Sequence, residues 1–141
     1  MTIDNEEYIY AQAYAKALNS GDSKLQKRIA VDYVRHMEEM FVFYEKLSKD
    51  TLGYEVPQIL LVHMNALNAN HLADLTAMIR KRNYRIITIG EALKDPAYAI
   101  RDTYIGARGL SWIQRWRATK GQPLRPEPEA SPWVARLAAG S

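Results

Sequence analysis

The segment Pro57-Gln-Ile-Leu-Leu-Val-His63 places the strongest constraint on the fold of this chain. A proline opens it, a run of apolar residues follows, and a histidine stands where that run ends. A short apolar run of branched residues is typical of a strand that is buried on both faces. Because an asparagine-rich turn comes next, we expect His63 at the carboxyl end of a parallel strand, where binding and catalytic groups collect in α/β folds.

The residues that follow complete a βαβ pattern. Apolar side chains recur at helical spacing from about residue 70 to residue 82, and the branched run 84–89 predicts a second strand. Strand, helix and strand within about thirty residues form one βαβ unit with parallel strands. Two parallel strands do not make a stable sheet alone, so the unit requires neighbouring strands.

Two helices are predicted before this unit. The first has Asp4 or Asn5 as its N-cap and acids in its first turn, and it ends at Asn19-Ser-Gly21. From Ser23 to about Asp50 the apolar residues follow an uninterrupted three-and-four spacing, which predicts one long amphipathic helix. At 1.5 Å per residue it would span about 40 Å. A helix of that length either wraps a core or projects into a partner.

The C-terminal part divides into an aromatic segment and a tail. Residues 98–121 are rich in Tyr, Gly, Arg and Trp, and Ser111 can cap a short helix there. The tail holds four of the six prolines and is predicted to be extended, with Pro132 opening one last helical turn. We therefore expect an α/β domain over residues 1–121 and a Pro-rich tail over residues 122–141.

Composition excludes several classes of protein. The absence of cysteine excludes disulfides, thiolate zinc sites and a cysteine nucleophile. A net charge of +3 permits an acidic ligand but does not require nucleic acid. No apolar run reaches membrane-spanning length, and the first residues lack the pattern of a signal peptide. We expect a cytoplasmic protein that binds neither nucleic acid nor a membrane.

His63 is the first candidate for chemistry. An unperturbed imidazole titrates near pH 6.5, which suits a general acid or base. The alternative is a structural histidine that is hydrogen-bonded at the end of a strand. Together with His71 it does not supply the three protein ligands of an open zinc site, so no metal site is predicted.

A second candidate site precedes the predicted helix at Ser111. Glycines and an arginine before a helix N-terminus can hold an anion or a diphosphate, and the alternative is a tight turn. Trp112 and Trp116 either pack in the core or stack on a sugar or nucleobase. The residues of this candidate anion site are Gly106, Arg108, Gly109 and Ser111.

Three segments resemble the C-terminal half of bacterial polysaccharide deacetylases. They are the segment ending in His63 with the following Met-Asn-Ala-Leu-Asn-Ala, the segment Tyr-Arg-Ile-Ile-Thr-Ile-Gly-Glu-Ala-Leu-Lys-Asp-Pro-Ala-Tyr98, and Gly-Leu-Ser-Trp-Ile-Gln-Arg-Trp116. The resemblance runs from Thr2 to about Gly121. It implies that His63 is a general acid to the leaving amine.

The same resemblance assigns further residues. Asp4, in Thr2-Ile-Asp-Asn5, matches the aspartate that supports the histidine of the family. Trp112 and Trp116 lie where the family places substrate-side residues, and they are candidate substrate-binding residues; Asn65, beside His63, is a further candidate. The family's Thr-Phe-Asp-Asp-Gly and His-x-x-x-His motifs, which supply its metal site, are absent. The resemblance therefore implies that residues 1–121 form an incomplete half of a (β/α) barrel. It also implies that this chain alone is not competent for metal-dependent deacetylation.

Unpaired strand edges and apolar faces of such a half would favour association. We expect a homo-oligomer, a dimer or tetramer, that associates through the helix over residues 23–50. The alternative architecture is a mainly helical oligomeric assembly.

Two functions are compatible with these residues. One is a deacetylase-derived fragment that binds saccharides. The other is a fragment repurposed as a small oligomeric enzyme with an interface active site, for example an NAD(P)-dependent oxidoreductase acting on a small polar or sugar-like substrate. That second function rests on the available group types, because the Gly-x-Gly-x-x-Gly fingerprint is absent.

Overall fold

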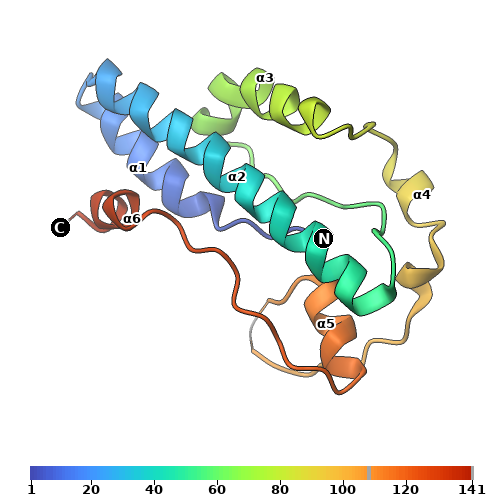
Figure 1. Cartoon of the computed structure of the whole chain (residues 1–141). Helices are drawn as coiled ribbons and strands as arrows, with labels where there is room; N and C mark the ends of the chain where they lie inside the picture. The colour runs from blue at the N-terminus through green and yellow to red at the C-terminus, as the bar shows by residue number, and fades with distance from the viewer. Residues whose placement is uncertain (108, 141) are drawn as a thin grey trace. The chain divides into compact units, whose positions relative to one another are not determined.

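The protein is described by a computed structural model that covers residues 1–107 and 109–140, and these form helices joined by extended segments (Figure 1). In chain order the elements are α1 (Glu7–Asn19), α2 (Ser23–Leu52), α3 (Ala66–Lys81), α4 (Ile89–Ala92), the 3-10 helix η1 (Pro96–Ala99), α5 (Trp112–Thr119) and α6 (Pro132–Ala139). The described residues contain no strand and no sheet, only one isolated parallel bridge between Ile3 and Leu60.

The chain divides into two compact units. The first comprises Met1–Asp4, Met40–Leu61 and Ile86–Glu127, and the second comprises Asn5–Glu39, Val62–Arg85 and Pro128–Ser141. The long helix α2 contributes its N-terminal part to the second unit and its C-terminal part to the first. Although α2 is long enough to cross a bilayer, it is too polar to do so, and no other described helix qualifies.

Most helical predictions are confirmed, although the N-cap of α1 is Glu6 and not Asp4 or Asn5. The long amphipathic helix is α2, and Asp22 Oδ1 accepts a hydrogen bond from the Leu25 N–H at its start, at 2.9 Å. Ser111 caps α5, and Pro132 opens α6. The helix expected from residue 70 begins earlier, at Ala66, because Asn65 is its N-cap.

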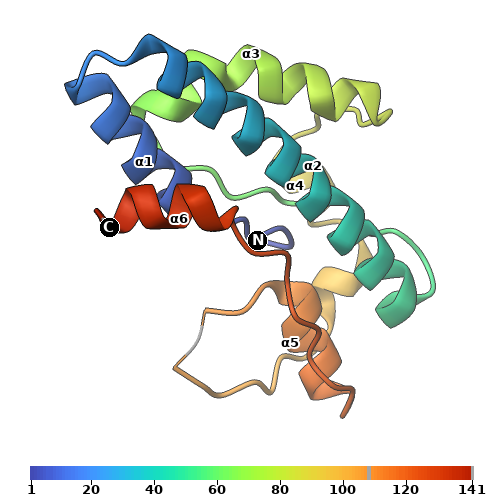
Figure 2. The same ribbon diagram turned by 60° about the vertical axis from the view of Figure 1, so that its left-hand side comes forward.

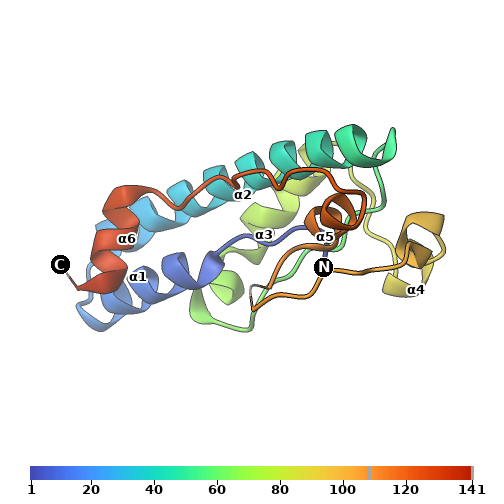
Figure 3. The same cartoon turned by 90° about the horizontal axis from the view of Figure 1, so that it is seen from below.

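The second unit packs α1 against α3 and α6, and two further views show α6 lying beside α1 (Figures 2 and 3). Lys16 Nζ donates to the carbonyl oxygens of Leu137 at 3.0 Å and Ala138 at 2.7 Å. The Leu137 carbonyl also accepts from the Gly140 N–H at 3.3 Å, so the ammonium adds to the C-cap of α6 and supplies a donor at the Ala138 carbonyl. The guanidinium of Arg28 lies 4.1 Å from the ring centre of Trp133. The end of the Pro-rich tail is therefore a docked helix.

In the first unit, the extended segment that precedes His63 pairs with the N-terminus of the chain. The Thr2 N–H donates to the Ile59 carbonyl at 2.9 Å, and the Leu61 N–H donates to the Ile3 carbonyl at 3.3 Å. The Ile3 side chain is completely buried. The prediction of a strand buried on both faces is therefore wrong: the segment is extended, it forms one isolated bridge with Ile3, residues 57–61 are half-buried and Val62 is 42% exposed.

The predicted βαβ unit and the incomplete (β/α) barrel are wrong. In the segment 84–89, Ile86 is 67% exposed and Ile89 begins helix α4 instead of ending a strand. Branched residues favour a strand only where cross-strand neighbours can pack against them. Among the described residues, one backbone bridge provides such a neighbour, and it pairs Ile3 with Leu60, not with residues 84–89. The mainly helical alternative is the nearer description, and its assembly stays a prediction.

Within the first unit, side chains from α5 and its C-cap bind the C-terminal end of α2. Arg117 is 4% exposed and donates from Nη1 to Thr51 Oγ1 at 3.0 Å and from Nε to the Pro123 carbonyl at 3.0 Å. Lys120 Nζ donates to the Thr51 carbonyl at 2.9 Å. Cations at a helix C-terminus satisfy its last carbonyls and favour its dipole. Arg117 of α5 and Lys120 at its C-cap therefore hold the end of α2.

Alkaline pH is expected to weaken the first unit through Tyr98. Its hydroxyl donates to the Pro57 carbonyl, and burial raises its pKa to about 12. Because an unfolded tyrosine titrates near pH 10, the unfolded chain loses this proton first as the pH rises. The contribution of Tyr98 to the free energy of unfolding should be constant below pH 10 and fall between pH 10 and 12. Urea titrations across this range should show a shallower fall for Tyr98→Phe, and an unchanged slope would contradict the assignment.

Candidate functional site

His63 and Glu7 form a hydrogen-bonded pair in the second unit. Nδ1 of His63 lies 3.0 Å from Glu7 Oε1, and the same oxygen accepts from the His63 backbone N–H at 2.8 Å. The Glu7 side chain is only 2% exposed, whereas the imidazole is 65% exposed. Because a carboxylate only accepts, the proton of a neutral imidazole lies on Nδ1. Nε2 has no protein partner among the described residues and is available to a ligand.

The start of α1 places Glu7. It is the first residue of the helix, and its N–H donates to Asn5 Oδ1 at 3.1 Å. Glu6, just before it, has a positive φ of 49°, so the chain turns sharply into the helix. A carboxylate is favourable at a helix N-terminus because of the helix dipole.

Two asparagines supply the other hydrogen bonds of the buried carboxylate. Asn65 donates from Nδ2 to Glu7 Oε1 at 3.1 Å, and Asn68 donates from Nδ2 to Glu7 Oε2 at 2.7 Å. Asn68 Nδ2 also reaches the His63 carbonyl at 2.8 Å. The Asn68 side-chain oxygen accepts from the Tyr33 hydroxyl at 2.7 Å. The N-cap and the first turn of α3 therefore carry the donors that hold both oxygens of Glu7.

An open pocket of about 480 Å³ adjoins this dyad. Its volume is within the range typical of small-ligand sites. Three of its apolar side chains are strongly exposed: Met64 fully, Leu72 at 57% and Val62 at 42%. The pocket suits a ligand with one apolar face and a polar group near the imidazole. Its lining residues are Val62, His63, Met64, Asn65, Ala66, Asn68, Ala69 and Leu72.

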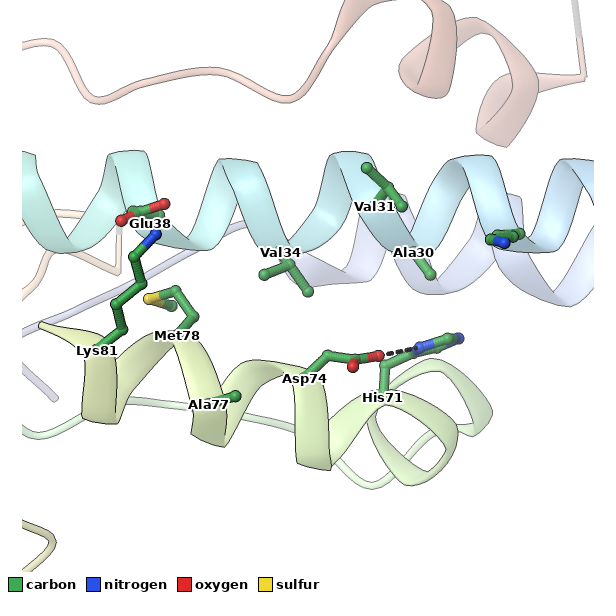
Figure 4. A pocket seen from close by; sticks show the side chains of 10 residues that line it. Ala30, Val31, Val34, Glu38, His71, Asp74, Ala77, Met78 and Lys81 are labelled. Atoms are coloured by element: carbon green, nitrogen blue, oxygen red, sulfur yellow. Dashed lines mark hydrogen bonds and ion pairs between the residues drawn. The ribbon is translucent and has the colours of Figure 1, made fainter.

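A second pocket, of about 590 Å³, lies between α2 and α3 (Figure 4). At one end Asp74 Oδ2 lies 2.9 Å from Nδ1 of His71, at a kink in α3, and the Tyr14 hydroxyl lies 3.3 Å from Nε2. Both ring nitrogens of His71 therefore have protein partners. The pocket beside His63 is the stronger candidate because its imidazole keeps a free nitrogen. The apolar lining of the second pocket is Ala30, Val31, Val34, Ala77 and Met78.

The candidate anion site falls in the first unit and is only partly described. Arg108 lies outside the described residues. A side chain at Gly106 would require the Tyr104 ring to move, and Gly109 faces open space. Ser111 is completely buried, and its hydroxyl accepts from the Gln114 N–H at 3.3 Å. Its oxygen is used in capping α5, and an NAD(P) site in this segment stays a prediction.

The two tryptophans of α5 pack within the first unit. Their ring centres lie 6.5 Å apart, and Tyr98 contacts Trp112 at 5.0 Å and Trp116 at 5.5 Å. Trp116 is 3% exposed, so its ring faces cannot receive a sugar. Trp112 is partly exposed and stays a candidate.

The carboxylate that contacts His63 is Glu7, whereas Asp4, the predicted partner, belongs to the first unit. An acid in the first turn of a helix is expected from the helix dipole alone, so the sequence does not mark Glu7 as the partner of His63. Tyr33 fits the apolar spacing of α2, and Asn68 is one of several asparagines after His63, so neither is marked as a site residue. The asparagines that follow His63 were the one available signal, because several amide donors close together indicate a buried acceptor nearby.

Residues 1–107 and 109–140 contain no cluster of three or more His, Asp or Glu side chains able to hold a metal ion. The residues present therefore do not fit the metal that the resemblance implies. The candidate site is an imidazole and a carboxylate beside an apolar pocket. Comparison of the chain with protein-family models, with curated proteins and with solved structures finds no match.

Proposed function

We propose that this chain is a saccharide-binding protein related to the polysaccharide deacetylases, with His63 and Glu7 as an acid/base pair facing the ligand. The observation that carries the proposal is the exposed imidazole, held at Nδ1 by a buried carboxylate and free at Nε2. The chain alone is not competent for metal-dependent deacetylation, because it lacks the family's Asp-Asp and His-x-x-x-His motifs.

The chemistry available to this pair is proton transfer at Nε2. Glu7 holds the Nδ1 proton, so neutral His63 presents a lone pair that accepts a hydrogen bond or a proton. Once protonated, the imidazolium is stabilised by the Glu7 carboxylate and can donate at Nε2 to an amine. Such a positioned group contributes about 10²–10⁴-fold to a reaction when the remaining machinery is present.

An acylated amino sugar fits both features of the pocket. Its amide N–H can donate to Nε2 of His63, while the C–H face of the sugar ring and the acyl methyl group can cover apolar side chains. The exposed side chains of Met64 and Leu72 supply that apolar surface. A ligand that is polar on every face would leave this surface exposed to water.

Binding of N-acetylglucosamine oligomers tests the proposal. We expect titration to shift the NMR resonances of the His63 ring, and we expect His63→Ala to weaken binding about tenfold, the loss expected for one hydrogen bond. His71→Gln is the matched control, because its ring nitrogens already have protein partners. Absence of binding, or equal binding by His63→Ala, would refute the function. Release of acetate by the chain with added zinc would refute the stated lack of activity.

The same preparation tests the remaining predictions. Adding NAD and NADP to a thermal-shift screen checks the alternative oxidoreductase. Sedimentation gives the mass of the particle in solution, and we expect a dimer or tetramer, since apolar side chains such as Met64 and Val31 are exposed. A mass equal to one chain at all concentrations would exclude self-association.

A further inference from the structure

Tyr33 lies in the middle of the apolar stripe of α2, and its hydroxyl makes a polar contact with the candidate site. The side chain is completely buried, and the hydroxyl donates to Asn68 Oδ1 at 2.7 Å. Buried tyrosine hydroxyls usually find one partner, and here that partner is itself bonded to the dyad. Burial and the nearby charge of Glu7 raise the pKa of Tyr33, so it remains a donor at ordinary pH.

The amide of Asn68 has only one orientation that fits its surroundings. On one side it faces Glu7 Oε2 at 2.7 Å and the His63 carbonyl at 2.8 Å, and both of these groups only accept. Its NH₂ must therefore point toward them, which turns its oxygen toward Tyr33. The Tyr33 hydroxyl gives that buried oxygen its donor.

Glu7 is held through this amide. With Oε2 occupied by Asn68, Oε1 is aligned to accept from both the backbone N–H and Nδ1 of His63. If the carboxylate turned away, Nδ1 would lose its acceptor, and the proton of a neutral imidazole would distribute over both nitrogens. The availability of Nε2 thus depends on the orientation of Glu7.

We propose that Tyr33 is a positioning residue for His63, acting through Asn68 and Glu7 to keep the imidazole proton on Nδ1 and the Nε2 lone pair toward the pocket. The role of this lone pair in ligand binding rests on the proposed function. The chain of hydrogen bonds that fixes it does not, and it can be measured in the free protein.

The tautomer of His63 is the direct readout. In long-range ¹H–¹⁵N spectra of the whole chain at alkaline pH, where an imidazole is neutral, we expect a protonated Nδ1 and an unprotonated Nε2. In Tyr33→Phe the two ¹⁵N shifts should move toward each other. The His63 amide should exchange with solvent about tenfold faster or more, because its acceptor is less firmly held.

Tyr14→Phe is the matched control. Tyr14 is also a buried tyrosine of the second unit, but its hydroxyl contacts His71. That variant should alter the His71 ring signals and leave those of His63 in place. A general loosening of the unit would instead move both sets of signals in both variants, and that would overturn a specific role for Tyr33.

Asn68→Ala tests the route. It removes the link between Tyr33 and Glu7 and keeps a good helix former in α3. We expect at least as large a change in the His63 tautomer as in Tyr33→Phe. An unchanged tautomer in either variant, with a folded amide spectrum, overturns the proposal. If the His63 tautomer changes as expected in both variants but the parent chain binds no saccharide, only the proposed function is overturned.

Discussion

Replacing Glu7 with glutamine is expected to lower the free energy of unfolding by about 2–4 kcal/mol and to release the His63 ring. The buried carboxylate accepts from the backbone and ring of His63, from Asn65 and from Asn68. A glutamine keeps one acceptor and turns an NH₂ group toward the Asn68 donor. It also removes the charge that makes these bonds about twice as strong as neutral ones.

Glu6→Gln is the control for this change. Glu6 is the neighbouring acid, it is partly exposed, and its side chain has no partner among the described residues. Surface substitutions of this kind usually change stability by less than about 0.5 kcal/mol. Urea unfolding of both variants, with the His63 tautomer followed in parallel, compares them directly. Equal losses in the two variants would show that the hydrogen bonds of Glu7 add nothing beyond its charge at the helix start.

The helices were predictable because their signals are local. The three-and-four spacing of α2 and the side-chain caps at Asp22 and Ser111 each involve residues that are close in sequence. A side chain that bonds a backbone N–H three residues away leaves a readable pattern. The start of α3 was misplaced because Asn65, its cap, was read as part of a turn.

The candidate site was only half predictable, for the opposite reason. His63 could be chosen from its place after an apolar run, but its partner Glu7 lies 56 positions earlier in the chain. No periodicity connects those positions. Tyr33 fits the apolar stripe of α2 whether or not its hydroxyl has a function. The helical spacing therefore does not predict its hydrogen bond to Asn68. Contacts of this kind depend on how helices pack.

The strands failed because strand formation is decided by neighbours. Residues 57–62 and 84–89 have similar composition, rich in branched apolar side chains. The first meets the N-terminal residues and forms the bridge at Ile3, whereas the second leaves Ile86 exposed. The same composition therefore gives a paired segment in one place and an exposed one in the other. Propensity alone cannot separate the two.

Alanine substitutions of Ile3 and Ile86 test this difference between the two segments. Ile3→Ala is expected to cost about 2–5 kcal/mol, because the side chain is completely buried and its loss leaves a cavity. Ile86→Ala should cost less than about 0.5 kcal/mol, because the side chain is 67% exposed. Had residues 84–89 formed a buried barrel strand, the two losses would be similar.

The first unit contains both isoleucines and, in Trp112 and Trp116, its own fluorescent probes. In a Trp133→Phe background, urea unfolding followed by tryptophan fluorescence reports on this unit alone. If the slope of the unfolding free energy against urea concentration is unchanged, each variant altered stability and not the extent of unfolding. A larger loss for Ile86→Ala than for Ile3→Ala would restore a core role to residues 84–89. A loss confined to Ile3→Ala would mean that the N-terminal residues supply the contact on which the segment before His63 depends.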